Sequence, residues 1–300
     1  MKGQLSMALP VYASTGQKLW HYVFHIFCGA VFFYLVAPIF VIIPLSFNAG
    51  DYFTYTPEML ALERDAFSLQ HYRNAMTDEW LVPLSNSFKI AIPATILSVA
   101  LGTLASIGLT QPNVPFKRPI MAILISPMIV PLVVSGYGMT LFYAPLGNWI
   151  NMTFGVDDTT VRFLRVIFAH TVLGIPFVVI TVTATLAGFD HSLTRAAANL
   201  GAGPIRTFFK VQMPLILPGM ISGGLFAFIT SFDEVVVILF LGAAETQTLP
   251  WQMFNGLREQ ISLTILAVAT LLITFSVVLL VTLELLRRRS ERLRGITVID

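Results

Sequence analysis

The sequence contains little charge. Only 11% of its 300 residues are Asp, Glu, Lys or Arg, and 56% are hydrophobic, whereas a soluble domain usually carries about 25% charged residues. A larger core cannot explain this deficit at such a length, so much of the surface must face something other than water. The composition therefore predicts an integral membrane protein.

Cysteine is nearly absent, and several catalytic motifs are missing. The single cysteine, Cys28, excludes an intrachain disulfide and a cysteine-based zinc site, and the five histidines show no spacing typical of a metal site. The chain contains no G-x-S-x-G, H-E-x-x-H or G-x-x-x-x-G-K-[ST] motif. The last of these is the P-loop, so we expect any ATP to bind to another chain. The net charge of +2 gives no indication of nucleic-acid binding.

Long stretches without charge are the main feature that the sequence does have. About 20 apolar residues in a helix cross the ~30 Å hydrocarbon layer of a membrane. The first stretch is too long for the apolar region of a signal peptide, and we interpret it as a retained anchor. Asp233 and Glu234 interrupt the fifth stretch. Six spans are expected, over residues 23–47, 90–109, 119–146, 166–189, 215–242 and 261–283.

The basic residues predict the orientation of these spans. If the N-terminus is cytoplasmic, the inner connections and tails carry about twice as many Lys and Arg residues as the outer ones. The outer connections are acidic and contain Trp80, Trp149 and Trp251. Both termini are therefore expected in the cytoplasm, and the longest inner connection joins the fourth span to the fifth.

This inner connection has the pattern of two short helices with a hinge. Ser192 is a suitable N-cap, Gly201 stands where a helix ends in a left-handed residue, and Gly203-Pro204 can restart the chain. Two interpretations remain open. The segment is either a basic amphipathic loop lying on the inner leaflet or a surface that docks another protein.

The same connection carries a longer sequence pattern. Its residues are Arg195, Ala196, Ala197, Leu200, Gly201, Ala202, Phe209, Val211, Pro214 and Pro218. This run resembles the EAA loop of the membrane subunits of binding-protein-dependent ABC importers. In that family the loop forms a coupling helix that inserts into the ATPase, which implies an ATPase contact through residues 195–197, 200–202 and Arg206. The family's leading glutamate is Arg195 here, so an ion pair made by that glutamate is not expected.

Two further segments resemble the polyamine branch of this family, specifically its second permease. They are residues 67–72 (FSLQHY) and 231–237 (SFDEVVV), the latter followed by Thr248-Leu249-Pro250. The resemblance spans roughly residues 67–286 and implies a type I ABC importer permease for a small amine, most of all spermidine or putrescine. The same branch includes importers of other amine-bearing solutes, such as γ-aminobutyrate, opines and 2-aminoethylphosphonate.

The resemblance also implies the partners and the location of the chain. These are a second homologous permease, two ATPase subunits that hold ATP and Mg²⁺, and a periplasmic solute-binding protein, around a multi-pass protein of the bacterial inner membrane. No cofactor is expected in this chain. The expected regions are a cytoplasmic tail (1–22), a first transmembrane helix (23–47), a periplasmic segment (48–85), a permease core (86–286) with its coupling loop (190–214), and a basic cytoplasmic tail (287–300).

Asp233 and Glu234 are the only acids deep in an apolar stretch. A charge at the centre of a membrane helix costs about 2.5–3.5 kcal/mol, and adjacent helical residues point about 100° apart. Either the acids are held by hydrogen bonds to neighbouring helices, or one of them lines the translocation path and attracts a cation. The small residues at 102, 106 and 222–224 are expected to allow close helix packing.

Two other classes of membrane protein share some of these features. A secondary transporter with Asp233 or Glu234 as its proton site would need six spans but no coupling loop. A membrane protease would need an aspartate pair on separate helices or a Ser-His pair, and the two acids are adjacent instead. The loop at residues 192–210 favours the importer over both.

Overall fold

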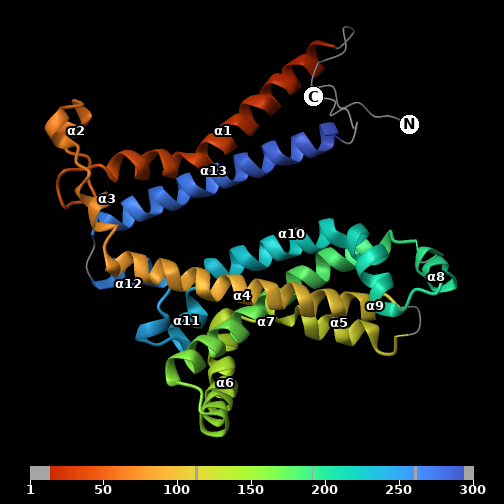
Figure 1. The fold of residues 1–300 in the computed structure, drawn as a ribbon. Helices are drawn as coiled ribbons and strands as arrows, with labels where there is room; N and C mark the ends of the chain where they lie inside the picture. The colour runs from red at the N-terminus through yellow and green to blue at the C-terminus, as the bar shows by residue number, and fades with distance from the viewer. Residues whose placement is uncertain (1–13, 112–113, 191, 260–261, 294–300) are drawn as a thin grey trace. The chain divides into compact units, whose positions relative to one another are not determined.

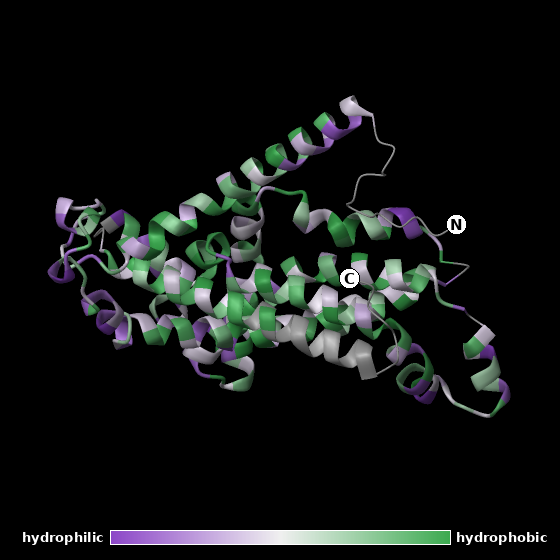
Figure 2. Cartoon of the chain, turned by 90° about the horizontal axis from the view of Figure 1, so that it is seen from above, coloured by the Kyte–Doolittle hydropathy of each residue, from purple (hydrophilic) through white to green (hydrophobic). Residues whose placement is uncertain are grey.

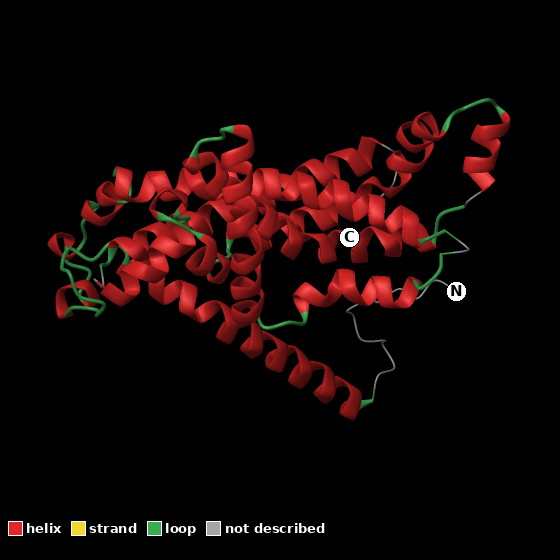
Figure 3. Cartoon of the chain, turned by 90° about the horizontal axis from the view of Figure 1, so that it is seen from below, coloured by secondary structure: helices red, strands yellow, loops and turns green. Residues whose placement is uncertain are grey.

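The computed structural model describes residues 14–111, 114–190, 192–259 and 262–293. Over these ranges the chain forms helices and loops, with one isolated antiparallel bridge between Asn48 and Phe67 (Figure 3). The all-α fold expected from the sequence is confirmed. The described residues divide into two compact units, one from residues 1–76 and 261–300 and the other from residues 77–260.

The first unit pairs the helices that lie at the two ends of the chain. α1 (Thr15–Leu45) begins at a capping box in which the Ser14 hydroxyl accepts from the Gln17 amide and the Gln17 side chain accepts from the Ser14 amide. α1 contacts α13 (Thr264–Leu293). The short helices α2 (Pro57–Leu60), η1 (Arg64–Ala66) and α3 (Gln70–Asn74) lie in the loop that follows α1.

Side chains fold this loop, residues 46–72, back on itself. The Ser46 and Tyr72 hydroxyls lie 2.6 Å apart, and the buried Asn48 amide donates to the carbonyl oxygens of Tyr52 and Thr54. The Gln70 amide donates to the Ala49 carbonyl oxygen. These contacts satisfy backbone groups that no regular element pairs.

Three helices form the centre of the second unit. α4 (Asp78–Leu109), α7 (Asp158–Ala187) and α10 (Met213–Phe232) run side by side (Figure 1). Asp157 caps the start of α7: its carboxylate accepts from the Thr160 amide at 2.8 Å, and this hydrogen bond lowers the pKa of Asp157. Buried apolar side chains fill the space between the helices in two clusters.

Small residues bring these three helices close together, as the sequence suggested. A Cβ added at Gly102 of α4 would lie 2.7 Å from the Val178 Cβ, and one at Gly174 of α7 would collide with the Ser98 hydroxyl. Gly223 of α10 lies against Thr181 of α7 in the same way. The central three helices therefore touch almost backbone to backbone, which is how helices associate in lipid.

The third expected span, residues 119–146, is wrong as a single helix. The chain forms α5 (Lys117–Ile125), the 3₁₀ turn η2 (Ser126–Met128) and α6 (Leu132–Phe154), with a bend of 103° between the two arms. Pro131 has no amide hydrogen and takes an extended conformation just before α6. The helical path is therefore interrupted completely at this proline.

The fifth expected span, residues 215–242, also consists of two pieces. Its helical path starts earlier, at α9 (Pro204–Thr207), and passes through a π-helical turn η3 (Phe208–Gln212) into α10. The helix ends at Phe232, and α11 (Val236–Leu241) follows after a gap. η4 (Ala244–Thr246) and α12 (Leu249–Glu259) complete the unit.

Four described helices are long and apolar enough to cross a membrane: Thr15–Leu45, Asp78–Leu109, Asp158–Ala187 and Pro204–Phe232. The bent pair α5–α6 makes a fifth if it counts as one span. In α13, the sixth expected span, the apolar part with described side chains covers only Thr264–Val278. The side chains of the basic tail from residue 287 lie outside the described residues. Apolar residues cover most of the long helices (Figure 2).

The tight packing at Gly102 is a testable feature of this fold. Gly102→Leu forces a side chain into Val178 and should lower stability by about 1–3 kcal/mol, seen as a lower thermal unfolding midpoint of the purified protein. Gly108→Leu is the matched control on the same helix, because a Cβ there meets nothing within 4 Å. Equal midpoints for the two variants would contradict the close α4–α7 contact.

Candidate functional site

The connection between α7 and α10 contains its own short helix, α8 (Ser192–Asn199). Ser192 was expected to cap this helix from outside. Instead Ser192 is the first helical residue, and its amide donates to the Asp190 carboxylate at 2.8 Å. Asp190 suits the position because a carboxylate stabilises the positive end of a helix. His191 lies outside the described residues.

Gly201 ends α8 in the left-handed conformation that the sequence predicted. Its φ is +79°, the Gly201 amide donates to the Ala198 carbonyl oxygen, and the Ala202 amide donates to the Ala197 carbonyl oxygen. This pair of hydrogen bonds is the Schellman motif. Gly203 then caps α9, and Pro204 is its first residue, as expected.

The turn after α8 leaves large apolar side chains uncovered. Leu200 is 88% exposed and Ile205 is 76% exposed, on either side of the turn. The basic side chains of Arg195 and Arg206 are exposed as well, while Ala197 is half-buried. Figure 1 shows α8 beyond the end of the three central helices. An exposed apolar surface edged by charge is typical of a protein-binding site.

The structure places each residue of the expected loop site within one segment. Residues 192–210 contain all of them, between two helices that are long enough to span a membrane. All lie in the second unit. The predicted members are Arg195, Ala196, Ala197, Leu200, Gly201, Ala202 and Arg206.

The acids expected in the fifth span lie at a break between helices. Asp233 is the C-cap of α10, and Val235 is the N-cap of α11. The expectation that Asp233 and Glu234 point about 100° apart on one helix is wrong, because neither residue belongs to a helix. The two side chains differ in environment instead: Asp233 is exposed, and Glu234 is only 6% exposed.

Glu234 has a structural contact that accounts for its burial. Its Oε1 accepts a hydrogen bond of 3.0 Å from the Val237 amide, in the first turn of α11. The first amides of a helix have no partner within it, so the carboxylate satisfies one of them and faces the positive end of α11. Asp233 is exposed and is therefore the acid that remains accessible to a solute.

An aromatic cluster that sequence reasoning missed lies at the same end of α10. Phe88 of α4 has its ring centroid 5.3 Å from that of Phe232 and 6.4 Å from that of Phe228, and the Phe228 and Phe232 rings are 5.7 Å apart. All three side chains are half-buried. The four-residue spacing of Phe228 and Phe232, directly before Asp233, was visible in the sequence, but nothing indicated Phe88.

His170 ties α7 to this end of α10. Its Nδ1 lies 2.8 Å from the Ser231 hydroxyl, and the histidine side chain is 1% exposed. Nε2 has no hydrogen-bond partner in the described part of the chain. Among the residues that the structure describes, no three His, Cys, Asp or Glu side chains lie close enough to hold a metal ion.

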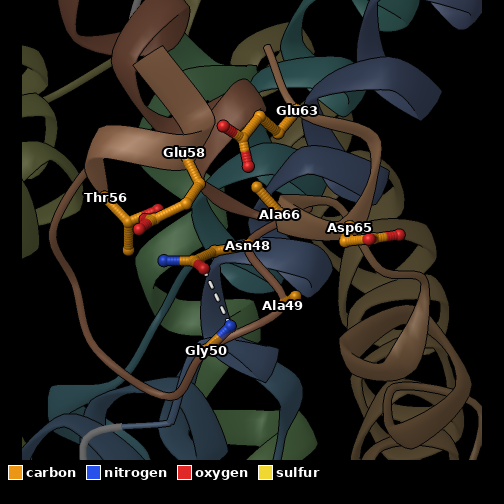
Figure 4. Close-up of a pocket in the computed structure, with 8 residues that line it drawn as sticks. All are labelled: Asn48, Ala49, Gly50, Thr56, Glu58, Glu63, Asp65 and Ala66. Atoms are coloured by element: carbon orange, nitrogen blue, oxygen red, sulfur yellow. Dashed lines mark hydrogen bonds between the residues drawn. The ribbon is translucent and has the colours of Figure 1, made fainter. Parts of the chain in front are cut away.

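A second acidic feature lies in the first unit, in the loop after α1. A pocket of about 230 Å³ there is lined by Asn48, Ala49, Gly50, Thr56, Glu58, Glu63, Asp65 and Ala66. Figure 4 shows that Glu58 reaches toward Thr56 and Asn48, whereas Asp65 points away from them. The three carboxylates do not converge on one point, so the pocket is not a preformed cation site.

Comparisons with known proteins agree with this arrangement. Residues 13–292 match the family described as binding-protein-dependent transport system inner membrane component. The spermidine/putrescine transport system permease protein PotC of Haemophilus influenzae is 27% identical over 266 residues, which cover 88% of this chain and 96% of that protein. The putrescine transport system permease protein PotI of Escherichia coli K12 is 27% identical over 244 residues, 81% of this chain and 82% of that protein.

One solved structure supports the fold. A chain in the crystal structure of a bacterial ABC transporter, involved in the import of the acidic polysaccharide alginate, superposes with a TM-score of 0.65. The match covers 93% of this chain and 99% of that one, at 16% sequence identity. At this identity the likeness shows the arrangement of helices alone.

The different environments of the two acids can be tested by stability. Glu234→Ala removes the acceptor for the Val237 amide and should cost about 1–2 kcal/mol, whereas Asp233→Ala changes an exposed side chain and should stay within about 0.5 kcal/mol. Thermal unfolding midpoints of the two purified variants make the comparison. Glu234→Gln, which keeps an acceptor oxygen, should lie between wild type and Glu234→Ala. Equal midpoints for the two alanine variants would mean that Glu234 does not hold α11.

Proposed function

Because the chain belongs to the family of binding-protein-dependent transport system inner membrane components, we propose that it imports a small amine as the permease subunit of an ATP-driven transporter. Polyamines are the first candidates, since the relatives PotC and PotI are named for spermidine and putrescine transport. ATP and Mg²⁺ belong to partner ATPase subunits, because the chain has no P-loop.

The exposed surface at the end of α8 is the observation that carries this proposal. Leu200 and Ile205 leave a large apolar area exposed on a segment that also carries the exposed side chains of Arg195, Arg206 and Lys210. A lipid-lying helix would need a continuous apolar face, but here the apolar residues stand on both sides of a fixed glycine turn. We call this projecting segment, residues 192–210, the knob. Its fixed turn suits a cleft in an ATPase better than a membrane surface.

Each residue of this knob has a defined role in the proposal. Gly201 sets the turn, because a side chain there would oppose the positive φ. Ala196, Ala197 and Ala202 keep the surface small enough for close approach, and Leu200 supplies the apolar anchor. Arg195 and Arg206 supply charge at the edge, which sets orientation and association rate more than affinity.

A nearly continuous helical path connects the knob to Asp233. The helical path from Pro204 to Phe232 has 29 residues, which corresponds to about 43 Å at 1.5 Å per residue. It ends at Asp233, where the chain breaks before α11. A displacement of the knob by ATP-driven closure of the ATPases would tilt this helix as a rigid body and move the Asp233 end.

The Asp233 end has the chemistry that an ammonium group requires. Asp233 offers an exposed carboxylate. Phe232, which directly precedes it, forms a half-buried aromatic cluster with Phe88 and Phe228. Carboxylates and aromatic faces both attract cations. We assign the cation site to Asp233, while Glu234 supports it by holding α11.

The distribution of charge supports the expected orientation. The segment at residues 192–210 carries Arg195, Arg206 and Lys210, whereas the loop at residues 48–66 carries Asp51, Glu58, Glu63 and Asp65. We propose that the former faces the cytoplasm and that the latter faces the periplasm, where a solute-binding protein docks. A second homologous permease completes the path.

A second candidate solute is an amine that also carries an acid group, such as γ-aminobutyrate, an opine or 2-aminoethylphosphonate. An unpaired arginine, Arg165, beside a pocket of the second unit favours it. An ATPase-independent carrier is the candidate from a different class, and it predicts uptake without any ATPase.

Uptake by the complex reconstituted in liposomes tests the proposed function. The permeases, ATPase and binding protein together should accumulate labelled putrescine only with internal ATP, and permease chains alone should accumulate none. Unlabelled spermidine, γ-aminobutyrate, opines and 2-aminoethylphosphonate, added as competitors, rank the solutes. Asp233→Asn should lower putrescine uptake per assembled complex several-fold, at unchanged basal ATP hydrolysis, because it removes the attracting charge.

The control for this experiment is Asp157→Asn, which removes an exposed acid at the start of α7. Uptake by the permease chains without ATPase would contradict the importer proposal. Wild-type uptake per complex in Asp233→Asn would remove Asp233 from the solute path.

A further inference from the structure

A pocket of the second unit opens between α6, α7 and α11. Its volume is about 220 Å³, enough for a small polar group but less than a drug-sized ligand fills. No acidic side chain lines it. The lining residues are Thr140, Ala144, Arg165, Phe240, Leu241 and Gly242.

Arg165 is held in place beside this pocket by α6. A Cβ added at Gly147 would lie 2.8 Å from the Arg165 Cδ and 3.3 Å from its Nε. The arginine stem therefore packs on a bare stretch of the α6 backbone, which only a glycine leaves open. Thr140, Ala144 and Gly147 follow one another at helical spacing, so this face of α6 carries both the pocket wall and the support for Arg165.

Arg165 has no partner for its charge in the described part of the chain. Its Nε is buried and forms no hydrogen bond. The two salt bridges found among the described residues both belong to Arg162, one turn earlier, which contacts Asp158 and Glu245 at 3.1 Å each. The Asp158 and Glu245 carboxylates are thus already engaged.

A buried guanidinium nitrogen without a hydrogen-bond partner is costly. Arg165 lies about two turns inside α7, directly before the apolar stretch that begins at residue 166. Such a group is usually paired or serves a function. Snorkelling toward the headgroups would free the side chain of this cost, but the contact with Gly147 and the burial of Nε hold Arg165 at the pocket.

The chemistry of the pocket selects an oxyanion. A guanidinium binds carboxylate or phosphate-like groups through two parallel hydrogen bonds. The Thr140 hydroxyl already donates to the Gly136 carbonyl oxygen at 2.9 Å, so Arg165 supplies the free donors. We propose that this pocket binds the carboxylate or phosphonate group of the transported solute. The proposal rests on the proposed import of an amine, and it selects the second candidate solute, an amine that also carries an acid, in place of a polyamine.

The position of the pocket along the chain fits such a solute. Asp233 precedes α11, and the pocket residues 240–242 end it. The six residues of α11 rise about 9 Å. A carboxylate at one end of this short helix and a guanidinium at the other match the opposite charges of a zwitterion.

Binding to the purified complex tests the pocket without relying on transport. The thermal unfolding midpoint is measured in phosphatidylcholine nanodiscs while 2-aminoethylphosphonate, γ-aminobutyrate or putrescine is titrated at constant ionic strength. The two acid-bearing amines should raise the midpoint of the wild type. Arg165→Gln should raise the half-maximal concentration about tenfold or more, the loss expected for a charge-assisted pair, and Arg165→Lys should restore part of it. Arg162→Gln, a paired arginine one turn away, is the matched control and should behave like wild type.

Three results would overturn the proposal. The first is the absence of any shift with either acid-bearing amine while putrescine is imported normally. The second is an equal half-maximal concentration in wild type and Arg165→Gln. The third is a dependence on Arg165 that appears only when phosphatidylglycerol is added to the nanodiscs, since a lipid phosphate would then occupy the pocket. If the complex binds the acid-bearing amines through Arg165 but imports no amine, the pocket stands and the proposed function fails.

Discussion

A helix that breaks inside a membrane leaves backbone amides that only the protein itself can satisfy. In this chain the carboxylate of Glu234 meets that need by accepting from the Val237 amide at 3.0 Å. The contact allows the fifth apolar stretch to end at Phe232 and to restart as α11. The exposed position of Asp233 and the pocket at the far end of α11 both depend on this break.

Contacts with α4 and α7 hold α10 in place within the second unit. Glycines at positions 102, 174 and 223 bring α4, α7 and α10 into direct contact, and the His170–Ser231 hydrogen bond joins α7 to α10 near the break. The helical path from Pro204 to Phe232 joins the exposed turn after α8 to the break at Asp233. In the proposed function, this path carries a displacement from the turn to the acid.

Sequence reasoning reached the features that depend on local chemistry. The left-handed Gly201 and the restart at Gly203-Pro204 follow from the conformational limits of glycine and proline. The unusual acids at residues 233–234 were visible in the sequence, but the break of the helix there was not expected. Features that depend on distant residues were out of reach. The 103° bend at Pro131 needed knowledge of what packs around it, and nothing in the sequence links Phe88 to Phe232 or Gly147 to Arg165.

Accessibility of a single cysteine at position 200 tests most directly the claim that α8 and its turn are the cytoplasmic docking knob. Leu200→Cys is made in a Cys28→Ser background, so that the exposed native cysteine does not react. Labelling with an impermeant maleimide is measured in inside-out and right-side-out vesicles, with and without the ATPase. The account predicts rapid labelling in inside-out vesicles alone, slowed about tenfold or more when the ATPase covers the 88% exposed side chain. Labelling from the outside, or an equal rate with and without the ATPase, would contradict it.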